Sequence, residues 1–485
     1  MSRPAQGART YPAIREGVSF HVYPDHRVRV FSRSQSSRLL SWDAWQVYRL
    51  ADGTKTVDEI AVSLSRTWQV GDPDEVLLFC AKAEADGYLR LAPAAQPCSI
   101  PVVGSDTLWF PERAMIELTD RCNLRCQYCC SGCSPQNSSS LPADKIEWLF
   151  SLMHSNGVIA VQLTGGEPTI HPDFPRILGS ALSTFDSVGL LTNGVHLSPE
   201  VSQLMEAYKH KLIVQVSVDG SNEQVNAVAR GTRGTFAGTL RTITELLRRS
   251  IPVKVGVVVT PDNQRDLSAT CELMSKMGIR HLVITMPEGV GRGAALTQSV
   301  YSRPDPCWDE CVELIAQAYS DYKDLLFDPA SAVVRRHLER VHGCDAGLTN
   351  FVIDPRGDVK PCPLLPASAA KFGNIFRDNY ASLFNDTPLA RCCHSFSVRT
   401  GESACQGCKY QVHCGKCMAR VFFANKNRIA EREGLCPVAR RVCLAEGYDF
   451  DADVKFRLNL SPGESARHEA HKRAIPVACC LKAVV

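Results

Sequence analysis

Three closely spaced cysteines are the residues of this chain best suited to chemistry. Cys122, Cys126 and Cys129 lie in the segment TDRCNLRCQYCC. Three thiolates can bind three irons of a [4Fe–4S] cubane and leave the fourth iron open to a substrate or cofactor. A structural zinc site is the alternative. It requires four ligands, which Cys130 or Cys133 could complete.

A second group of nine cysteines lies between Cys344 and Cys436 and includes the pairs Cys405–Cys408 and Cys414–Cys417. The surrounding sequence is rich in glycine and turn residues and has little regular periodicity. Such a region can hardly bury enough apolar area by itself, so bound metal would stabilise it. Taken alone, the two Cys-x2-Cys pairs also fit a pair of zinc ribbons.

Composition narrows the class of protein. The 485 residues include 22 cysteines, and the formal net charge is +3 from 54 basic and 51 acidic residues. This balance gives no electrostatic reason to expect nucleic acid or an anionic membrane as a partner. The N-terminus lacks the apolar stretch of a secretory signal, and no apolar run is long enough to span a membrane. We therefore expect a cytoplasmic protein whose clustered thiols bind metal and do not form disulfides.

The middle of the chain alternates strand and helix patterns, which predicts an α/β fold. Six strands are expected, at residues 115–118, 158–164, 189–192, 211–219, 253–260 and 281–286. Helical patterns between them imply parallel strands with right-handed crossovers, in an open doubly wound sheet or an incomplete barrel. Active sites on such folds lie at the carboxyl ends of the strands. Cys122 follows the first expected strand and so falls at that edge.

The pattern Cys-x3-Cys-x-aromatic-Cys after a first strand resembles the signature of the radical S-adenosylmethionine (SAM) superfamily, and the resemblance continues through the later strand ends. It implies an incomplete (β/α)6 barrel of radical SAM type, in which a reduced cluster cleaves SAM. The cluster ligands would be Cys122, Cys126 and Cys129. The residues implied to bind SAM are Gly165, Gly166, Glu167, Pro168, Thr192, Asn193, Ser217, Asp219, Arg230 and Met286.

The second cysteine group resembles the SPASM extension, which holds two auxiliary [4Fe–4S] clusters. The resemblance implies an inner cluster with ligands Cys344, Cys362 and Cys417, and an outer one with ligands Cys405, Cys408, Cys414 and Cys436. The last pair here is separated by two residues where the common pattern has three. Because no other cysteine lies between Cys344 and Cys362, the inner cluster lacks a fourth ligand, which Cys392 or Cys393 could supply. Otherwise that iron is open to substrate.

The N-terminal region predicts a small α+β unit. Residues 18–32 read as a β-hairpin, and three helical patterns follow up to residue 91. This winged-helix-like arrangement resembles the PqqD-like domains that recognise leader peptides of ribosomally made natural products. The third helical pattern carries one lysine among several acids, which argues against binding a phosphate backbone. An edge strand that accepts a peptide by strand addition fits better.

Five segments are expected: a leader-recognition domain with linker (1–106), the radical SAM partial barrel (107–305), a bridging helix (306–341), the SPASM domain (342–445) and a C-terminal tail (446–485). Together they imply a peptide maturase that installs a thioether or carbon–carbon crosslink. Its partners would be a precursor peptide with a leader and an electron donor such as flavodoxin or ferredoxin. The alternatives are protein side-chain oxidation, radical modification of a small molecule such as a tetrapyrrole, and a non-catalytic, metal-bearing peptide-binding module.

Overall fold

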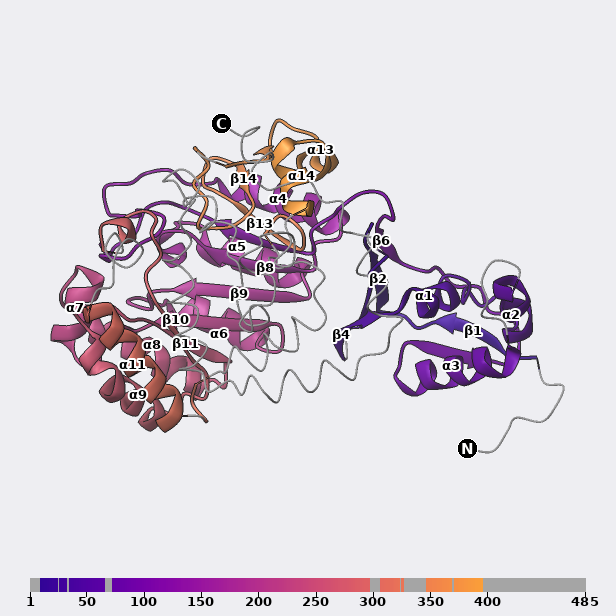
Figure 1. Cartoon of the computed structure of the whole chain (residues 1–485), viewed down its shortest axis with the longest axis horizontal. Helices are drawn as coiled ribbons and strands as arrows, with labels where there is room; N and C mark the ends of the chain where they lie inside the picture. The colour runs from indigo at the N-terminus through magenta and orange to yellow at the C-terminus, as the bar shows by residue number, and fades with distance from the viewer. Residues whose placement is uncertain are drawn as a thin grey trace. The chain divides into compact units, whose positions relative to one another are not determined.

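The structure is a computed structural model that describes residues 9–24, 26–32, 35–65, 72–296, 306–322, 324–326, 346–368 and 370–395. The chain divides into two compact units. One comprises Met1–Glu112 with Ser155–Gly157, and the other comprises Arg113–His154 with Val158–Val485. Figure 1 shows both units, with helices and strands numbered in chain order and labelled where there is room.

The N-terminal unit contains two small sheets. Their strands are β1 (Tyr11–Ile14), β2 (Val18–Val22), β3 (Val28–Ser32), β4 (Gln35–Leu40), β5 (Leu89–Ala92) and β6 (Val102–Gly104). Strands β2, β3 and β4 are antiparallel, which confirms the predicted hairpin, and β6 adds to β2 in parallel to give the order β4-β3-β2-β6. Strand β6 forms within the segment that the sequence suggests is a linker. Strands β1 and β5 pair separately.

Three helices follow the hairpin as predicted: α1 (Trp42–Tyr48), α2 (Val57–Ser65) and α3 (Pro73–Ala85). Helix α1 begins at Ser41, whose hydroxyl accepts a hydrogen bond from the Ala44 amide at 3.1 Å. At the start of α3, the Asp72 carboxylate accepts one from the Asp74 amide at 2.9 Å. These helices and β2 enclose an apolar core.

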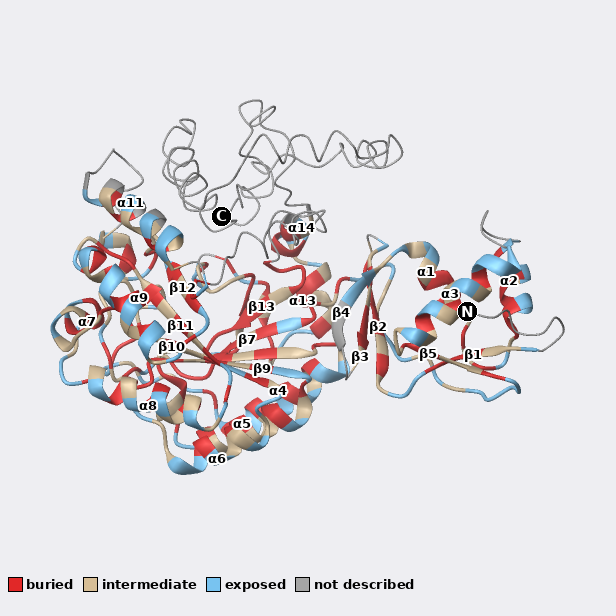
Figure 2. Cartoon of the chain, turned by 90° about the horizontal axis from the view of Figure 1, so that it is seen from below, coloured by how far each residue is buried: buried red, intermediate tan, exposed pale blue. Residues whose placement is uncertain are grey.

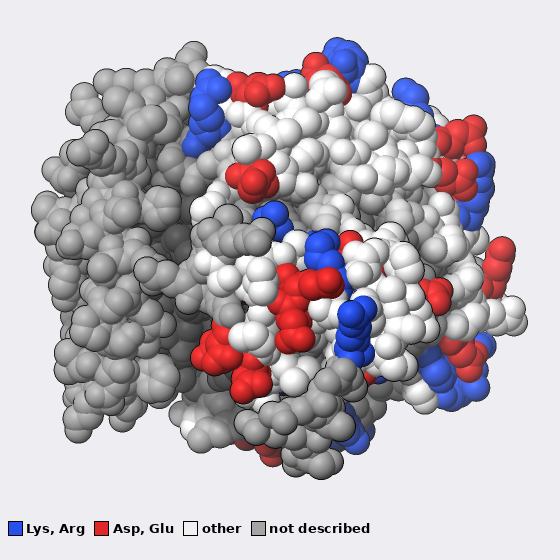
Figure 3. Space-filling model, turned by 90° about the vertical axis from the view of Figure 1, so that its right-hand side faces the viewer, with Lys and Arg blue, Asp and Glu red and all other residues white. Residues whose placement is uncertain are grey.

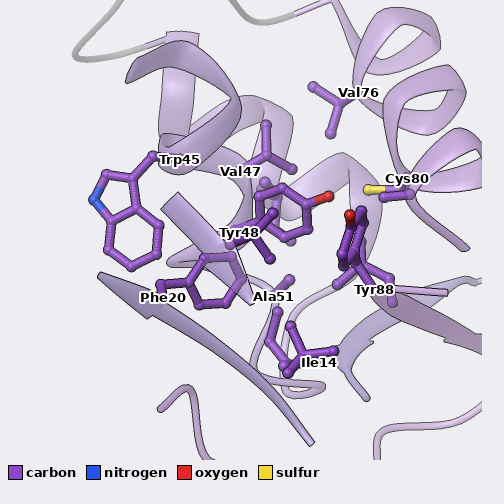
Figure 4. Packing of buried hydrophobic residues seen from close by; sticks show 14 of the residues in the cluster. Ile14, Phe20, Trp45, Val47, Tyr48, Ala51, Val76, Cys80 and Tyr88 are labelled. Carbon is purple, nitrogen blue, oxygen red and sulfur yellow. The ribbon is translucent and has the colours of Figure 1, made fainter. Parts of the chain in front are cut away.

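The core of the N-terminal unit is built around Tyr48 (Figure 4). Its ring centroid lies 5.1 Å from that of Phe20 and 6.5 Å from that of Tyr88. Ile60 and Leu89 belong to the same cluster and are fully buried. The unit thus has a core of its own.

The second unit is organised on six parallel strands. They are β7 (Arg113–Glu117), β8 (Ala160–Thr164), β9 (Ser187–Thr192), β10 (Leu212–Ser217), β11 (Val253–Val258) and β12 (Leu282–Thr285). Their spatial order follows their chain order. Right-handed crossovers between sequentially ordered parallel strands place every connecting helix on the same face, so the sheet curls toward a barrel. This order confirms the incomplete barrel over the doubly wound alternative.

Helices connect and follow these strands: α4 (Ala143–Ser155), α5 (Phe174–Thr184), α6 (Pro199–Ala207), α7 (Glu223–Arg230), α8 (Phe236–Arg248), α9 (Leu267–Lys276) and α11 (Pro306–Asp321). Helices between successive strands agree with the alternating pattern that the sequence predicts. Figure 2 shows α4, α5, α6 and α8 along the strands, with buried residues toward the sheet and exposed residues away from it.

Three further strands extend the same sheet beyond β7: β13 (Asn350–Ile353), β14 (Asp358–Lys360) and β15 (Gly373–Asn374). Strand β13 pairs with β7 in parallel, and β14 returns antiparallel after the turn at residues 354–357. Helices α13 (Tyr380–Asn385) and α14 (Pro388–Ser395) follow. The sequence suggested little regular structure here, although the turn Asp-Pro-Arg-Gly between two apolar segments is a hairpin signal.

Candidate active site

The three cysteines follow β7 at the carboxyl edge of the sheet. The Cys122 amide donates to the Ser134 carbonyl at 3.1 Å, which closes the loop that carries Cys126 and Cys129. All three thiols belong to one packed cluster with Leu124, and Cys122 is only 8% exposed. The fold therefore brings together the residues that the sequence predicted as cluster ligands.

The thiols differ in acidity. Burial raises the pKa of Cys122 to about 12 and also raises that of Cys126. A hydrogen bond shared with Cys133 lowers the pKa of Cys129 and raises that of Cys133, and the positive charge of Arg292 also favours the Cys129 thiolate. Because cysteine binds iron as the thiolate, Cys122 and Cys126 would lose their protons on binding metal.

Glu167 joins the ends of two strands. Its Oε1 accepts hydrogen bonds from the Thr169 hydroxyl at 2.7 Å and amide at 3.1 Å, and from the Thr192 hydroxyl at 2.7 Å. Its Oε2 accepts one bond, from the Asn193 amide at 2.7 Å. The carboxylate is 1% exposed, and burial raises its pKa. Glu167 thus holds the loops after β8 and β9 together, and only Oε2 has acceptor capacity to spare for an ammonium group.

Gly165 and Gly166 press against the cysteine loop. The Gly166 amide donates to the Thr119 carbonyl at 2.6 Å, and the Glu167 amide donates to the Arg121 carbonyl at 3.0 Å. Gly165 has φ of +138°, and a Cβ on either glycine would overlap one of these carbonyl oxygens. Glycine is required for this close approach of two backbones. Gly165 and Gly166 therefore position the cysteine loop whether or not SAM is present.

Asn193 extends the same arrangement to the loop itself. Its Nδ2 donates to Asn123 Oδ1 at 2.7 Å and lies 4.0 Å from the Cys122 sulfur. Its backbone carbonyl accepts from the Thr239 hydroxyl at 3.0 Å. The residue is buried and holds the segment between the first two cysteines.

A buried ion pair lies at the end of β10. Arg230 Nε is 2.6 Å from Asp219 Oδ2, and both side chains are no more than 5% exposed. The Tyr128 hydroxyl donates to the same carboxylate oxygen, while Asp219 Oδ1 accepts from the Val258 amide at 2.8 Å. Tyr128 is the aromatic residue of the cysteine motif, so this network ties the cysteine loop to β10 and β11.

Arg230 also offers a donor to a ligand. Its Nη2 is buried and has no hydrogen-bond acceptor among the described residues. An unsatisfied buried donor is costly, and a carboxylate such as that of SAM would satisfy it. Of the other predicted SAM contacts, Ser217 is half-buried at the end of β10 and Met286 is half-buried directly after β12. Pro168 is buried and begins a short 3-10 turn.

Two functional candidates were missed by sequence reasoning. Lys360 Nζ lies 3.0 Å from Glu117 Oε1, and both side chains are at most 8% exposed. This ion pair connects the carboxyl end of β7 to β14, two residues before Cys362. Arg292, flanked by glycines after β12, bonds to the cysteine loop. The only available signal was a charged residue placed close to a strand end.

Of the predicted auxiliary ligands, Cys362 is half-buried just after β14. Cys393 on α14 is fully buried, and a Cβ at Gly347 would come within 2.8 Å of its sulfur. Cys344, Cys405, Cys408, Cys414, Cys417 and Cys436 lie outside the described residues, as does the side chain of Cys392. Within the described ranges, no three Cys, His, Asp or Glu side chains surround a common point as ligands of one metal ion would.

Comparison with known proteins identifies the family. The chain matches the Radical SAM superfamily over residues 116–274 and the iron–sulfur cluster-binding domain SPASM over residues 344–415. It is also 31% identical over 317 residues to the mycofactocin maturase MftC of Mycobacterium tuberculosis, in an alignment that covers 63% of this chain and 78% of that protein. The chain belongs to the radical SAM superfamily. Its cofactors are SAM and [4Fe–4S] clusters.

Other similarities cover more of this radical SAM enzyme. The subtilosin biosynthesis protein AlbA of Bacillus subtilis is 26% identical over 442 residues, covering 89% of this chain and 96% of AlbA. The crystal structure of Streptococcus suis SuiB bound to the precursor peptide SuiA superimposes with a TM-score of 0.60 at 16% identity, covering 85% of this chain and 97% of that one. SuiB bound to SAM gives a TM-score of 0.59. These structures share the fold.

No helix among the described residues is both long and apolar enough to cross a membrane.

Proposed function

We propose that this radical SAM enzyme is a maturase that crosslinks a ribosomally synthesised precursor peptide. The observation that carries the proposal is the extent of the AlbA alignment. Its 442 residues are more than the chain contains after Glu112, so the alignment extends into the N-terminal unit. AlbA takes part in the biosynthesis of a bacteriocin, and SuiB binds a precursor peptide.

A small-molecule substrate is the second candidate, because the AdoMet-dependent heme synthase of Methanosarcina barkeri is 28% identical over 335 residues. That alignment covers 65% of this chain but 93% of the heme synthase. An alignment of this length can lie entirely outside the N-terminal unit. An enzyme that acts on a small molecule has no leader peptide to bind and so would not require that unit. The N-terminal unit therefore favours a peptide.

In the proposed site, Cys122, Cys126 and Cys129 hold the SAM-cleaving cluster. When bound, the cluster and SAM supply a 5′-deoxyadenosyl radical that abstracts hydrogen from a peptide carbon. Glu167 Oε2, which accepts one hydrogen bond, and the Gly165–Pro168 backbone would bind the amino group of SAM, and the unsatisfied Arg230 Nη2 would bind its carboxylate. Thr192, Asn193, Ser217 and Asp219 lie at the strand ends that would surround SAM, and Met286, directly after β12, would contact its adenine.

The auxiliary region completes the proposal. Cys344, Cys362 and Cys417 hold an inner cluster, and Cys405, Cys408, Cys414 and Cys436 hold an outer one. Crosslinking would release one hydrogen atom to the radical, one proton to solvent and one electron, which clusters held by these cysteines could accept. We assign the SPASM domain to residues 342–445. The barrel is assigned to residues 107–305, the bridging helix to 306–341 and the tail to 446–485. A cytoplasmic flavodoxin or ferredoxin would reduce the enzyme.

Leader recognition is assigned to residues 1–106 and, within them, to the edge strand β4. Among the described strands, β4 pairs only with β3, so its other edge is free for strand addition. Arg38 of β4 lies 3.3 Å from Asp86, which follows α3 and so places these two elements side by side. Leu39 is 37% exposed and Leu78 of α3 is 72% exposed. A leader strand along β4 would cover such apolar side chains.

The surface charge of the described residues does not favour nucleic acid as a partner. On the face seen in Figure 3, lysine and arginine side chains are interspersed with aspartate and glutamate among the described residues. A surface of this kind supports binding through main-chain hydrogen bonds and apolar contacts more than binding through phosphate charge.

The test of function uses the reconstituted, reduced enzyme with SAM and a cysteine-containing precursor peptide encoded beside its gene. The expected product has lost the mass of two hydrogen atoms for each crosslink, with 5′-deoxyadenosine formed in step. An unmodified peptide, together with turnover of a tetrapyrrole, would favour the small-molecule candidate.

The test of leader recognition compares three exposed apolar residues of the N-terminal unit. Leu39→Lys and Leu78→Lys should each weaken precursor binding on the order of tenfold, because they alter the proposed contact surface. Val62→Lys, on α2 and 50% exposed, is the matched control and should leave binding unchanged. Equal affinities in all three variants would remove β4 and α3 from the proposal. Peptide-independent SAM cleavage should be the same in each.

A further inference from the structure

Arg292 makes three hydrogen bonds to the cysteine loop. Its Nε donates to the Cys126 carbonyl at 2.8 Å and its Nη2 donates to the Cys133 carbonyl at 2.8 Å. Its backbone amide donates to the Cys129 carbonyl at 2.9 Å. One residue, distant in sequence, therefore fixes the backbone at three cysteines of this loop.

The loop has weak internal support at the same positions. The Cys129 amide reaches the Cys126 carbonyl at 3.3 Å, and the Gly132 amide reaches the Cys129 carbonyl at 3.3 Å. Both distances exceed the usual length of an amide–carbonyl hydrogen bond. The bonds from Arg292 are shorter, and the two from its guanidinium are charge-assisted, so they are the stronger constraint on the loop.

The backbone beside Arg292 is adapted to this contact. Gly291 has φ of +58°, and a Cβ there would overlap the carbonyl oxygens of Cys129 and Cys130. Only glycine allows the chain to pass this close, and that passage is what places the Arg292 amide and guanidinium on the loop.

We propose that Arg292 is a positioning residue that clamps the loop of the SAM-cleaving cluster and raises the reduction potential of that cluster. The proposal rests on the assignment of Cys122, Cys126 and Cys129 as the ligands. The acceptors of Arg292 are neutral carbonyls, so they do not cancel its charge. A cation close to the cluster stabilises the reduced form, which carries one more negative charge than the oxidised form.

The experiment uses the full-length holoenzyme and the variants Arg292→Met and Arg292→Lys. Arg265→Met is the control, because Arg265 pairs with Glu310 at 3.0 Å and its side chain is 81% exposed. The readouts are the midpoint potential of the cluster whose electron paramagnetic resonance signal changes when SAM is added, and the anaerobic rate at which a chelator removes its iron.

Arg292→Met should shift the midpoint to a more negative potential and speed iron removal on the order of tenfold, since two charged hydrogen bonds are lost. Arg292→Lys should recover most of the potential, because it restores the charge. It should recover little of the iron retention, because an ammonium cannot span both carbonyls. Loss of the SAM-responsive cluster in Arg292→Met with the auxiliary iron retained would also support the clamp.

A wild-type midpoint and wild-type iron release in Arg292→Met would overturn the proposal. If that variant does not fold, Arg292→Lys decides the clamp, because wild-type iron release there would contradict it. These results are separable from the ligand assignment itself. An error in that assignment would leave a SAM-responsive cluster after removal of Cys122, Cys126 and Cys129.

Discussion

The barrel edge and the N-terminal unit bury opposite kinds of side chain. At the barrel edge Glu167 and Asp219 are each 1% exposed, and their charged groups are held by hydrogen bonds and an ion pair. In the N-terminal unit the buried residues are largely apolar, among them Phe20 and Ile60. Buried polar groups need particular partners in particular places, whereas an apolar core requires little beyond volume and pattern. The residues of the candidate active site therefore form a recognisable sequence motif, whereas the residues of the N-terminal core do not.

The largest effect is expected from Gly165→Ala at the barrel edge. The added methyl group would overlap the Thr119 carbonyl at a φ of +138°, so the cysteine loop must move and the SAM-cleaving cluster should be lost. Iron content and SAM cleavage measure this. Gly179→Ala in α5 is the control. Its Cβ would meet only Leu204, at 3.7 Å, so unfolding should be unchanged or up to about 1 kcal/mol more difficult. A functional Gly165→Ala enzyme would show that the backbone contact is dispensable.

The next effect concerns the buried ion pair. Arg230→Met should destabilise the barrel by about 3–5 kcal/mol, because it leaves Asp219 charged, buried and unpaired. Adding Asp219→Asn to the same chain should recover part of that loss in a denaturant titration. Arg248→Met, which removes an ion pair whose arginine is 63% exposed, should leave the unfolding midpoint in place. If Arg230→Met and Arg248→Met changed the free energy of unfolding by the same amount, burial of the ion pair would not explain its contribution to stability.

Glu167→Gln keeps the shape of the side chain but places an NH2 group where the carboxylate accepts hydrogen bonds. The expected cost is about 1–3 kcal/mol, from donors at Thr192 or Asn193 left unsatisfied, and the affinity for SAM should also fall. Equilibrium binding of SAM and denaturant unfolding test the two effects. Glu147→Gln in the exposed pair with Arg176 is the matched substitution and should change neither.

The smallest effect is expected in the apolar core of the N-terminal unit. Ile60→Val removes one buried methylene and should cost about 1 kcal/mol of that unit's stability. SAM cleavage should keep its wild-type rate, because the residues proposed for it lie in the other unit. A reduced rate of peptide-independent SAM cleavage in this variant would show that the N-terminal core also affects the site in the other unit.

The same contrast explains what could be predicted from the sequence. The strands and the cysteine motif of the barrel could be predicted, since apolar runs alternate with helical patterns and polar residues recur at the strand ends. The roles of Glu167 and Asp219 were not readable, because motif resemblance pointed to SAM and gave no sign of the hydrogen bonds that these carboxylates accept from the protein itself. Short elements such as β6 and α7 carry too few residues to show a period.

Arg292 and Lys360 were missed for a different reason. Each acts across a long sequence separation, on Cys126 and Glu117 respectively. A single charged residue near a strand end is common, and only the folded arrangement shows which one reaches the cysteine loop. The extension of the sheet by β13 was hidden in the same way, since its partner β7 lies far earlier in the chain.

The central claim is that Cys122, Cys126 and Cys129 hold the cluster that cleaves SAM. The most direct test is to replace all three by alanine and to measure iron content and 5′-deoxyadenosine formed anaerobically with dithionite and SAM. The account predicts a loss of about four irons per chain, retention of the auxiliary iron and no 5′-deoxyadenosine. Formation of 5′-deoxyadenosine at the wild-type rate by this variant would contradict it.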